Sequence, residues 1–196
     1  MKAKVIYIIV KKYLCLFLIT LLLNPLLSAL NADDIIDIEE REKELQREAE
    51  LGNTDAQFLL GRLAIEGKTP PDHSLAVYWF RIAAESNHIQ AQEMLGAHFF
   101  SGLGVPANSE EAYNWWYKAA ILGSEKAQAS LGVLYALGTG VKKDMIESYK
   151  WLTIAAIHGN QEAQIQRDEA IALQMTADDI REAQKRINET LKIIKK

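Results

Sequence analysis

The residues best suited to bind a metal or to transfer a proton are four histidines: His73, His88, His98 and His158. None of them has a second ligand three or four positions away in a recognised metal-binding pattern, so we predict no metal site. His98 corresponds to Leu63 and Leu134 in two related segments of the chain, which favours a packed side chain over a ligand.

The sequence contains no motif for nucleophilic catalysis, since neither Gly-x-Ser-x-Gly nor His-Glu-x-x-His occurs. The pairs Gly102-x-Gly104 and Gly138-x-Gly140 resemble nucleotide loops only weakly, because no strand precedes them and no lysine follows at the required spacing. Turns explain them better. Carboxylate pairs such as Glu110-Glu111 begin predicted helices, where negative charge stabilises the helix dipole. We therefore predict a protein that is not an enzyme and holds no cofactor.

The aromatic run Trp115-Trp116-Tyr117 is a candidate platform for stacking a base or a sugar. Trp115, however, recurs at a fixed interval along the chain, and Trp116 corresponds to Phe80 and Leu152. Positions that are apolar in every copy of a repeat are typical of a core, so we predict packing for both tryptophans.

The charge of the chain argues against nucleic acid as a partner. All four charged residues before Leu30 are lysines, so the remainder carries 18 Lys and Arg against 26 Asp and Glu, a net charge of −8. Phosphates require a basic surface, whereas an uncharged or basic protein partner suits an acidic one. The only cysteine is Cys15, so the body cannot form an internal disulfide or a thiolate metal site.

Residues 1–30 have the layout of an export signal. Four lysines precede a run of 11 residues, Tyr13 to Leu23, that is apolar apart from Thr20 and that Asn24 and Pro25 end. The run is shorter than the about 20 residues that cross a bilayer, but it can be read on to Leu30. We therefore expect an exported protein, periplasmic or secreted. The alternative is an inner-membrane anchor over residues 13–30, and only this form would contact a membrane.

A 36-residue repeat organises the body of the chain. Trp79, Trp115 and Trp151 follow one another at intervals of 36, and each copy also repeats an Ala-Gln pair and a Leu-Gly pair. Apolar residues recur within each copy at helical spacing, which predicts two helices per repeat, helix A and helix B. The Leu-Gly glycines Gly61, Gly96 and Gly132 lie within helix A, where we expect the repeated tryptophan ring to fill the space beside them.

These patterns predict an all-α fold, a right-handed α-solenoid with a capping helix at each end. The expected segments are an N-terminal capping helix (33–52), repeats (53–88, 89–124, 125–160 and a partial 161–175) and a C-terminal capping helix (176–196). We expect the last helix to cover the open edge of the fourth helix A. A monomer is expected.

The order A-Q-x-x-L-G-x-x-Y-x-x-G-x-G-V, then A-x-x-W-x-x-K-A-A-x-x-G, resembles the Sel1-like repeat, a relative of the tetratricopeptide repeat. The resemblance covers residues 49–164 and is best over Ala91–Gly123 and Ala127–Gly159. Ala64 departs from it, since Phe99 and Tyr135 supply an aromatic at that position. The resemblance implies a non-catalytic adaptor in envelope processes, signalling or host contact. It also allows an antidote that holds an exported toxin, and a membrane-tethered structural or regulatory protein is a third possibility.

Binding is expected on one face of the A helices, opposite Leu60, Leu95 and Leu131, which is the concave face in tetratricopeptide-type solenoids. The positions there are free of the repeat pattern, so they are the ones able to suit a particular partner. The predicted protein-binding residues are Phe58, Arg62, Ile65, Glu93, Ala97, Phe100 and Val133. Exposed apolar residues in this set indicate binding, while packing between successive A helices is the alternative.

Overall fold

The computed structural model describes residues 32–67 and 70–194, and these residues form helices and no strand. The predicted export segment, residues 1–30, lies outside the described residues. The chain divides into two compact units, Met1–Leu45 and Gln46–Lys196. Helix α2 (Ala32–Glu50) provides the described part of the first unit, and its last residues belong to the second. The second unit contains the repeats.

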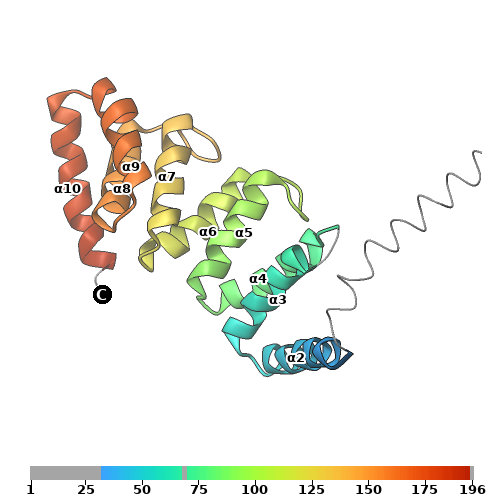
Figure 1. Cartoon of the computed structure of the whole chain (residues 1–196). Coiled ribbons are helices and arrows are strands. Elements are labelled where there is room, and N and C mark those ends of the chain that lie inside the picture. Colours follow the sequence, from blue (N-terminus) through green and yellow to red (C-terminus); the bar gives the residue numbers. More distant parts are fainter. Residues whose placement is uncertain (1–31, 68–69, 195–196) are drawn as a thin grey trace, which may run out of the picture. The chain divides into compact units, whose positions relative to one another are not determined.

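The repeats are helix pairs in which each helix packs on the next (Figure 1). Within the described residues the fold is thus the all-α solenoid that the repeat predicted. Helix A of each pair is α3, α5 or α7, and helix B is α4, α6 or α8. Their bounds are α3 (Thr54–Glu66), α4 (His73–Glu85), α5 (Ile89–Ser101), α6 (Ser109–Ile121), α7 (Glu125–Leu137) and α8 (Met145–Ile157).

Each helix A begins at a side chain that accepts backbone N–H groups of its first turn. These N-caps are Asn53, His88, Ser124 and Asn160. Such caps satisfy donors that have no partner within the helix. The residue before each of them has a positive φ, 92° at Gly52, 63° at Asn87 and 99° at both Gly123 and Gly159, which reverses the chain before the next helix A.

The glutamine of the Ala-Gln pair joins each helix A to the preceding helix. Nε2 of Gln92 donates to the carbonyl of Ala84 at 3.0 Å, and Nε2 of Gln128 donates to Ala120 at 2.9 Å. Gln57 makes the same bond to Ala49, at the end of α2, at 3.0 Å. The end of α2 therefore occupies the place of a helix B before the first repeat.

The mid-helix glycines lie against rings and side chains of helix B, but not against the repeated tryptophans. A methyl group on Gly61 would lie 2.5 Å from the ring of Phe80, and one on Gly96 would lie 2.5 Å from Trp116. Gly132 lies in the same way against Leu152. The prediction that Trp79, Trp115 and Trp151 fill this space was therefore wrong. Those three rings are also buried, but one position earlier on helix B, and so on another side of it.

The second glycine of each Gly-x-Gly linker rests on the preceding repeat. A methyl group on Gly104 would come within 2.4 Å of the backbone of His73, and one on Gly140 within 2.4 Å of Ser109. Both glycines have φ of 72°, which favours glycine over other residues. Close approach is thus a second reason for glycine there, besides the turn itself.

The solenoid ends irregularly. The fourth helix A starts as α9 (Gln161–Gln166), continues as a π-helical segment (Arg167–Ile171) and closes as a 3₁₀ turn (Ala172–Gln174). Helix α10 (Ala177–Ile194) follows and packs against α8 (Figure 1). It therefore covers helix B of the third repeat. The expectation that it covers the fourth helix A was wrong, because its apolar residues Ile187 and Leu191 join the core around Trp151.

Candidate functional site

The predicted binding face lies on α3, α5 and α7, and we call it the helix A face. It comprises the seven predicted residues together with Ala129 and Ala136 of α7. Helices α4, α6 and α8 pack on the opposite side of the A helices through the glycine contacts described above. Two hollows open along this face, one between α3 and α5 and the other between α5 and α7.

The first hollow has a volume of about 490 Å³. Four of the seven predicted residues line it: Phe58, Arg62, Ile65 and Glu93. The sequence did not single out its other lining residues, which are Asp55, Leu59, Glu66, His88, Gln90, Met94 and Lys126. A shallower space of about 600 Å³ adjoins it along the turns that begin α5 and α7.

Phe58 and Ile65 are only partly exposed on the helix A face. Both are half-buried and pack against the core. The ring of Phe58 stacks on the imidazole of His88 at 4.7 Å and tilts against Phe80 at 5.7 Å. The sequence left two alternatives for these residues, packing between helices and exposure for binding, and both apply here. One side of each residue packs against the core, and the other side lines the hollow.

The polar rim of the first hollow is held in place by specific contacts. Nδ1 of His88 accepts the N–H of Ala91, so in the neutral ring Nε2 carries the proton and lies 3.1 Å from Oδ1 of Asp55. Oγ of Ser124 donates to Oε1 of Glu93 at 2.5 Å. The Arg62 guanidinium pairs with Glu66 one turn later, at 2.8 Å. These contacts fix the rim without using its full capacity for hydrogen bonding.

The second hollow is smaller, about 310 Å³, and mainly apolar. It is lined by two of the predicted residues, Phe100 and Val133, together with Trp116, Ala129, Ser130, Leu134 and Gln166. Phe100 is 40% exposed, and its ring lies 5.6 Å from that of Trp116. The indole N–H of Trp116 donates to the carbonyl of Glu93 at 3.2 Å, which links the two hollows through one side chain. The remaining predicted residue, Ala97, lines neither hollow.

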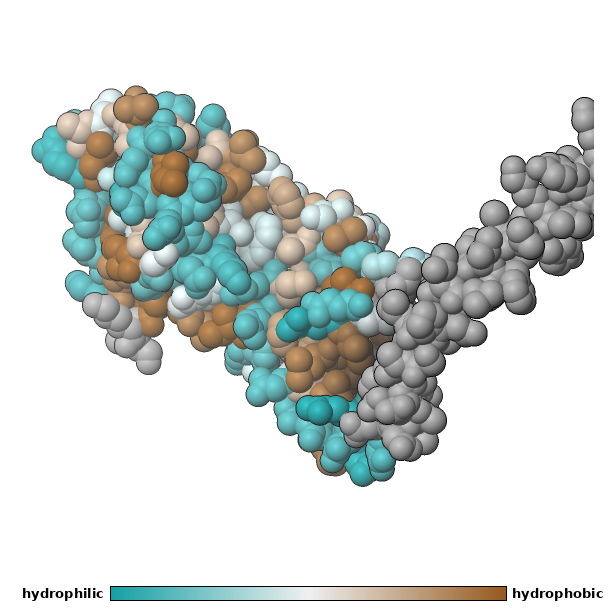
Figure 2. Space-filling view, in the orientation of Figure 1, coloured by the Kyte–Doolittle hydropathy of each residue, from teal (hydrophilic) through white to brown (hydrophobic). Residues whose placement is uncertain are grey.

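Viewed as in Figure 1, apolar surface lies over the region of α3 and α4 and is bordered by hydrophilic residues (Figure 2). Contiguous apolar surface with a polar border is typical of a surface that binds another protein.

A pair of histidines, His98 buried and His73 half-buried, lies at the contact of the first two repeats. His98 is 3% exposed, and its Nδ1 donates to the carbonyl of Met94 at 2.8 Å. Among the described residues, its Nε2 has no hydrogen-bond partner, nor has Nδ1 of His73, whose ring lies 5.5 Å away. Burial lowers the pKa of His98 below its ordinary value, and His73 lowers it further, while the bond to Met94 acts in the opposite direction. Burial thus favours the neutral form of the His98 imidazole.

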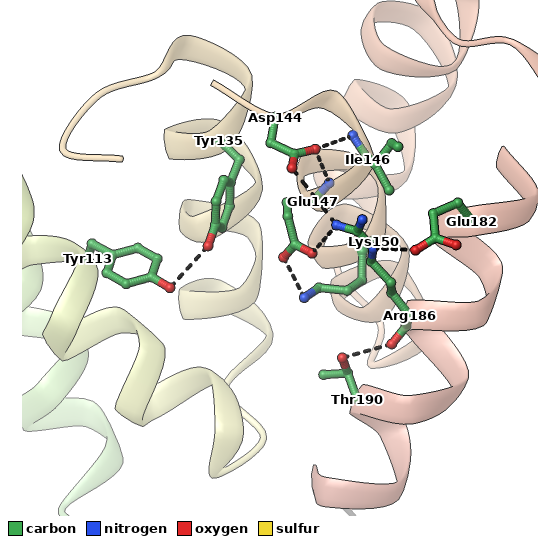
Figure 3. Close-up of polar contacts among 9 residues, drawn as sticks. All are labelled: Tyr113, Tyr135, Asp144, Ile146, Glu147, Lys150, Glu182, Arg186 and Thr190. Carbon is green, nitrogen blue, oxygen red and sulfur yellow. Dashed lines mark hydrogen bonds and ion pairs between the residues drawn. The ribbon is translucent and has the colours of Figure 1, made fainter. Parts of the chain in front are cut away.

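A network of charges connects α10 to α8 (Figure 3). Glu147 lies between two cations, 2.5 Å from Nζ of Lys150 and 2.9 Å from Nη1 of Arg186. Arg186 also donates to Glu182 at 2.9 Å, and these hydrogen bonds raise the pKa of its guanidinium. The network fixes the terminal helix, and its carboxylates are already paired.

A pair of tyrosines nearby is also committed to structure. The hydroxyls of Tyr113 and Tyr135 lie 3.0 Å apart (Figure 3). Burial and this hydrogen bond raise the pKa of Tyr135 far above its usual range, so its hydroxyl stays protonated.

Over 32–67 and 70–194, no three His, Cys, Asp or Glu side chains gather closely enough to hold a metal ion. In the same residues, no helix combines the length and the apolar character needed to span a membrane.

The Sel1 repeat family model matches residues 54–88, 89–124 and 125–160. Among solved structures, the chain is 40% identical to a protective antigen present in uropathogenic Escherichia coli strains and displaying an SLR fold, with a TM-score of 0.60. That match covers 63% of this chain and 27% of the antigen, so the chain spans only about a quarter of that protein. A Sel1 repeat protein from Oxalobacter formigenes is 33% identical, with a TM-score of 0.60.

The Oxalobacter match covers 65% of this chain and 96% of that protein. No curated protein matches the chain. The three matched repeats occupy more than half of the 196 residues. The chain belongs to the Sel1 repeat family.

Proposed function

We propose that this protein is an exported, non-catalytic scaffold that binds a protein or peptide on its helix A face. Sel1 repeat proteins are generally scaffolds for protein interactions, and their fold is typically non-catalytic. The observation that carries the proposal for this chain is the alignment of two hollows along successive A helices, lined in part by residues outside the repeat pattern. A solenoid favours an extended ligand, because each repeat contacts only its neighbours and encloses no deep cavity.

The composition of the face supports a protein ligand. The apolar side chain of Phe58 lines the first hollow together with the charged Arg62 and Glu93, and Phe100 lines the second hollow. Interfaces between proteins combine apolar anchors with a polar rim in this way.

Affinity capture with variants tests the proposal. The full-length chain would be used to capture partners from envelope and secreted fractions of its own cells, with partners identified by mass spectrometry. The double variant Arg62→Glu with Phe100→Ala should lose the captured partner, and the exposed control Lys143→Ala should retain it. A folded double variant that captures the same partner as the control would exclude the helix A face.

Export rests on the lysines and the short apolar run of residues 1–30. N-terminal sequencing of protein from the cell envelope should find a start near Leu30 or Asp33. If the anchor forms instead, the full-length chain should remain with membranes after carbonate extraction. Recovery of the full-length chain from the cytosol alone would exclude both forms.

A further inference from the structure

The two hollows are separated by a distance that an extended peptide can span. Glu93 lines the first and Phe100 the second, and both lie on α5. Seven residues of α-helix rise about 10 Å, at 1.5 Å per residue. A peptide in the polyproline II conformation covers that distance with about three residues, at about 3.1 Å each, and its side chains three positions apart point to the same side. Two side chains of one peptide, about three positions apart, can therefore enter both hollows.

The first hollow presents two carboxylates with unused capacity. Oδ1 of Asp55 is near His88 and Oε1 of Glu93 accepts from Ser124, whereas within residues 32–67 and 70–194 no group donates to Oδ2 of Asp55 or to Oε2 of Glu93. The Asp55 side chain is 84% exposed. A carboxylate that is already oriented by one hydrogen bond and retains a free oxygen is well suited to a cationic side chain.

The charges around the first hollow favour a cation over an anion. Three carboxylates, Asp55, Glu66 and Glu93, face two cations, Arg62 and Lys126. Arg62 is already paired with Glu66, which leaves Asp55 and Glu93 against Lys126. The chain after residue 30 carries a net charge of −8, and this charge also attracts a cationic ligand at long range.

The second hollow offers no comparable charge. Phe100, Trp116 and Val133 give it an apolar lining, and its volume of about 310 Å³ suits one large apolar side chain. The exposed edge of Phe100 would be covered by such a side chain.

We propose that the ligand is an extended peptide segment with an arginine or lysine about three positions from a large aliphatic or aromatic residue. The cationic side chain binds Asp55 and Glu93, and the apolar one enters the hollow at Phe100. This inference rests on the proposed function and adds the chemistry of the partner to it.

A library of displayed random 12-residue peptides, selected on the full-length chain in mild detergent, tests the inference. We expect enrichment of peptides that combine a basic residue with a large apolar one at a spacing of about three. The double variant Asp55→Asn with Glu93→Gln should bind a selected peptide about tenfold more weakly. Both substitutions keep the hydrogen-bond acceptors that His88 and Ser124 use, so the fold should be retained.

The matched control is Glu110→Gln with Glu189→Gln, which makes the same change in charge at exposed positions away from both hollows. This control should bind as the parent does. When the basic residue of the peptide is replaced by alanine, neutralising Asp55 and Glu93 should have no further effect. Conversely, Lys126→Gln should tighten binding of the basic peptide.

The outcomes separate the two proposals. The inference would be overturned, and the proposed function left intact, by selected peptides that bind Phe100→Ala more weakly but contain no basic residue. The same holds for peptides that bind Phe100→Ala more weakly but bind Asp55→Asn with Glu93→Gln as tightly as the parent. Peptides indifferent to Phe100→Ala and Arg62→Glu alike would count against both, as would a selection that enriches no peptide at all.

Discussion

The indole ring of Trp116 lies directly over the α-carbon of Gly96, so close that one added methyl group would come within 2.5 Å of its Nε1 atom. The same ring lines the second hollow and donates to the carbonyl of Glu93, in the first. Contact between helices and the shape of the helix A face therefore depend on one pair of residues.

Gly96→Ala should destabilise the protein, although alanine in a helix interior is normally favoured over glycine by about 1 kcal/mol. Overpacking against Trp116 should outweigh that gain and leave a net loss of about 1–3 kcal/mol in the free energy of unfolding. Urea denaturation measures it. In the background of Trp116→Ala the ring is absent, so Gly96→Ala should then be neutral or stabilising. Equal losses in both backgrounds would mean that the contact is not the cause.

Gln92→Leu should cost about 0.5–1.5 kcal/mol of stability, because it removes a buried hydrogen bond to the carbonyl of Ala84, which then keeps the N–H of Asn87 as its donor. The matched control is Gln164→Leu, at the corresponding position of the fourth helix A. Gln164 is exposed and its side chain makes no such bond, so that variant should change stability by less than about 0.5 kcal/mol. Similar melting curves for the two variants would contradict the role assigned to the glutamine.

Stability should fall in mild acid because of His98. Its pKa in the folded protein lies below the ordinary value of 6.5, so protonation favours the unfolded chain. The stability held above pH 6.5 should be lost progressively as the pH falls below 6.5 towards the folded-state pKa. Urea denaturation at pH 7.5 and pH 5.0 measures the difference. His98→Leu, which places the leucine of the neighbouring repeats there, should reduce it, and an unchanged difference would show that His98 is not responsible.

Glu147→Gln should loosen the terminal helix, because Lys150 and Arg186 share this carboxylate. Partial exposure of Arg186 limits the expected loss to about 1–2 kcal/mol. In this variant, hydrogen exchange in α10 should be faster than in the parent, while exchange in α5 should be unchanged. The exposed pair of Arg181 and Asp178 provides the control, since Arg181→Ala should leave exchange and stability nearly unchanged. Equal effects of the two substitutions would argue against a special role for the Glu147 network.

The sequence was most informative where one residue type recurs for one physical reason. The interval of 36 between tryptophans predicted the helix pairs, each of which ends in the structure at a residue with positive φ: Asn87, Gly123 or Gly159. The sequence was less informative about which side chain meets which. The contact of Gly96 with Trp116 depends on the rotation of helix B about its axis, which an interval alone does not fix.

The end of the solenoid was also hard to predict. Arg167 and Asp168 stand where earlier repeats have Leu-Gly, and they pair with each other at 2.7 Å. Without that glycine no helix B can approach closely, and the helix A pattern gives way to a π-helical segment. The site depends in the same way on packing. Met94 and His88 line the first hollow because of how α3 and α5 pack, and no sequence motif marks them.

Site-specific photo-crosslinking tests the central claim most directly. A photoreactive amino acid would replace Ala97, between the two hollows on α5, in the full-length chain produced in its own cells. The control would carry it at Tyr117, an exposed position on helix B. Binding on the helix A face predicts a discrete crosslinked partner from position 97 that disappears with Arg62→Glu and Phe100→Ala, and no such product from position 117. A partner crosslinked from position 117 and not from position 97 would contradict the account.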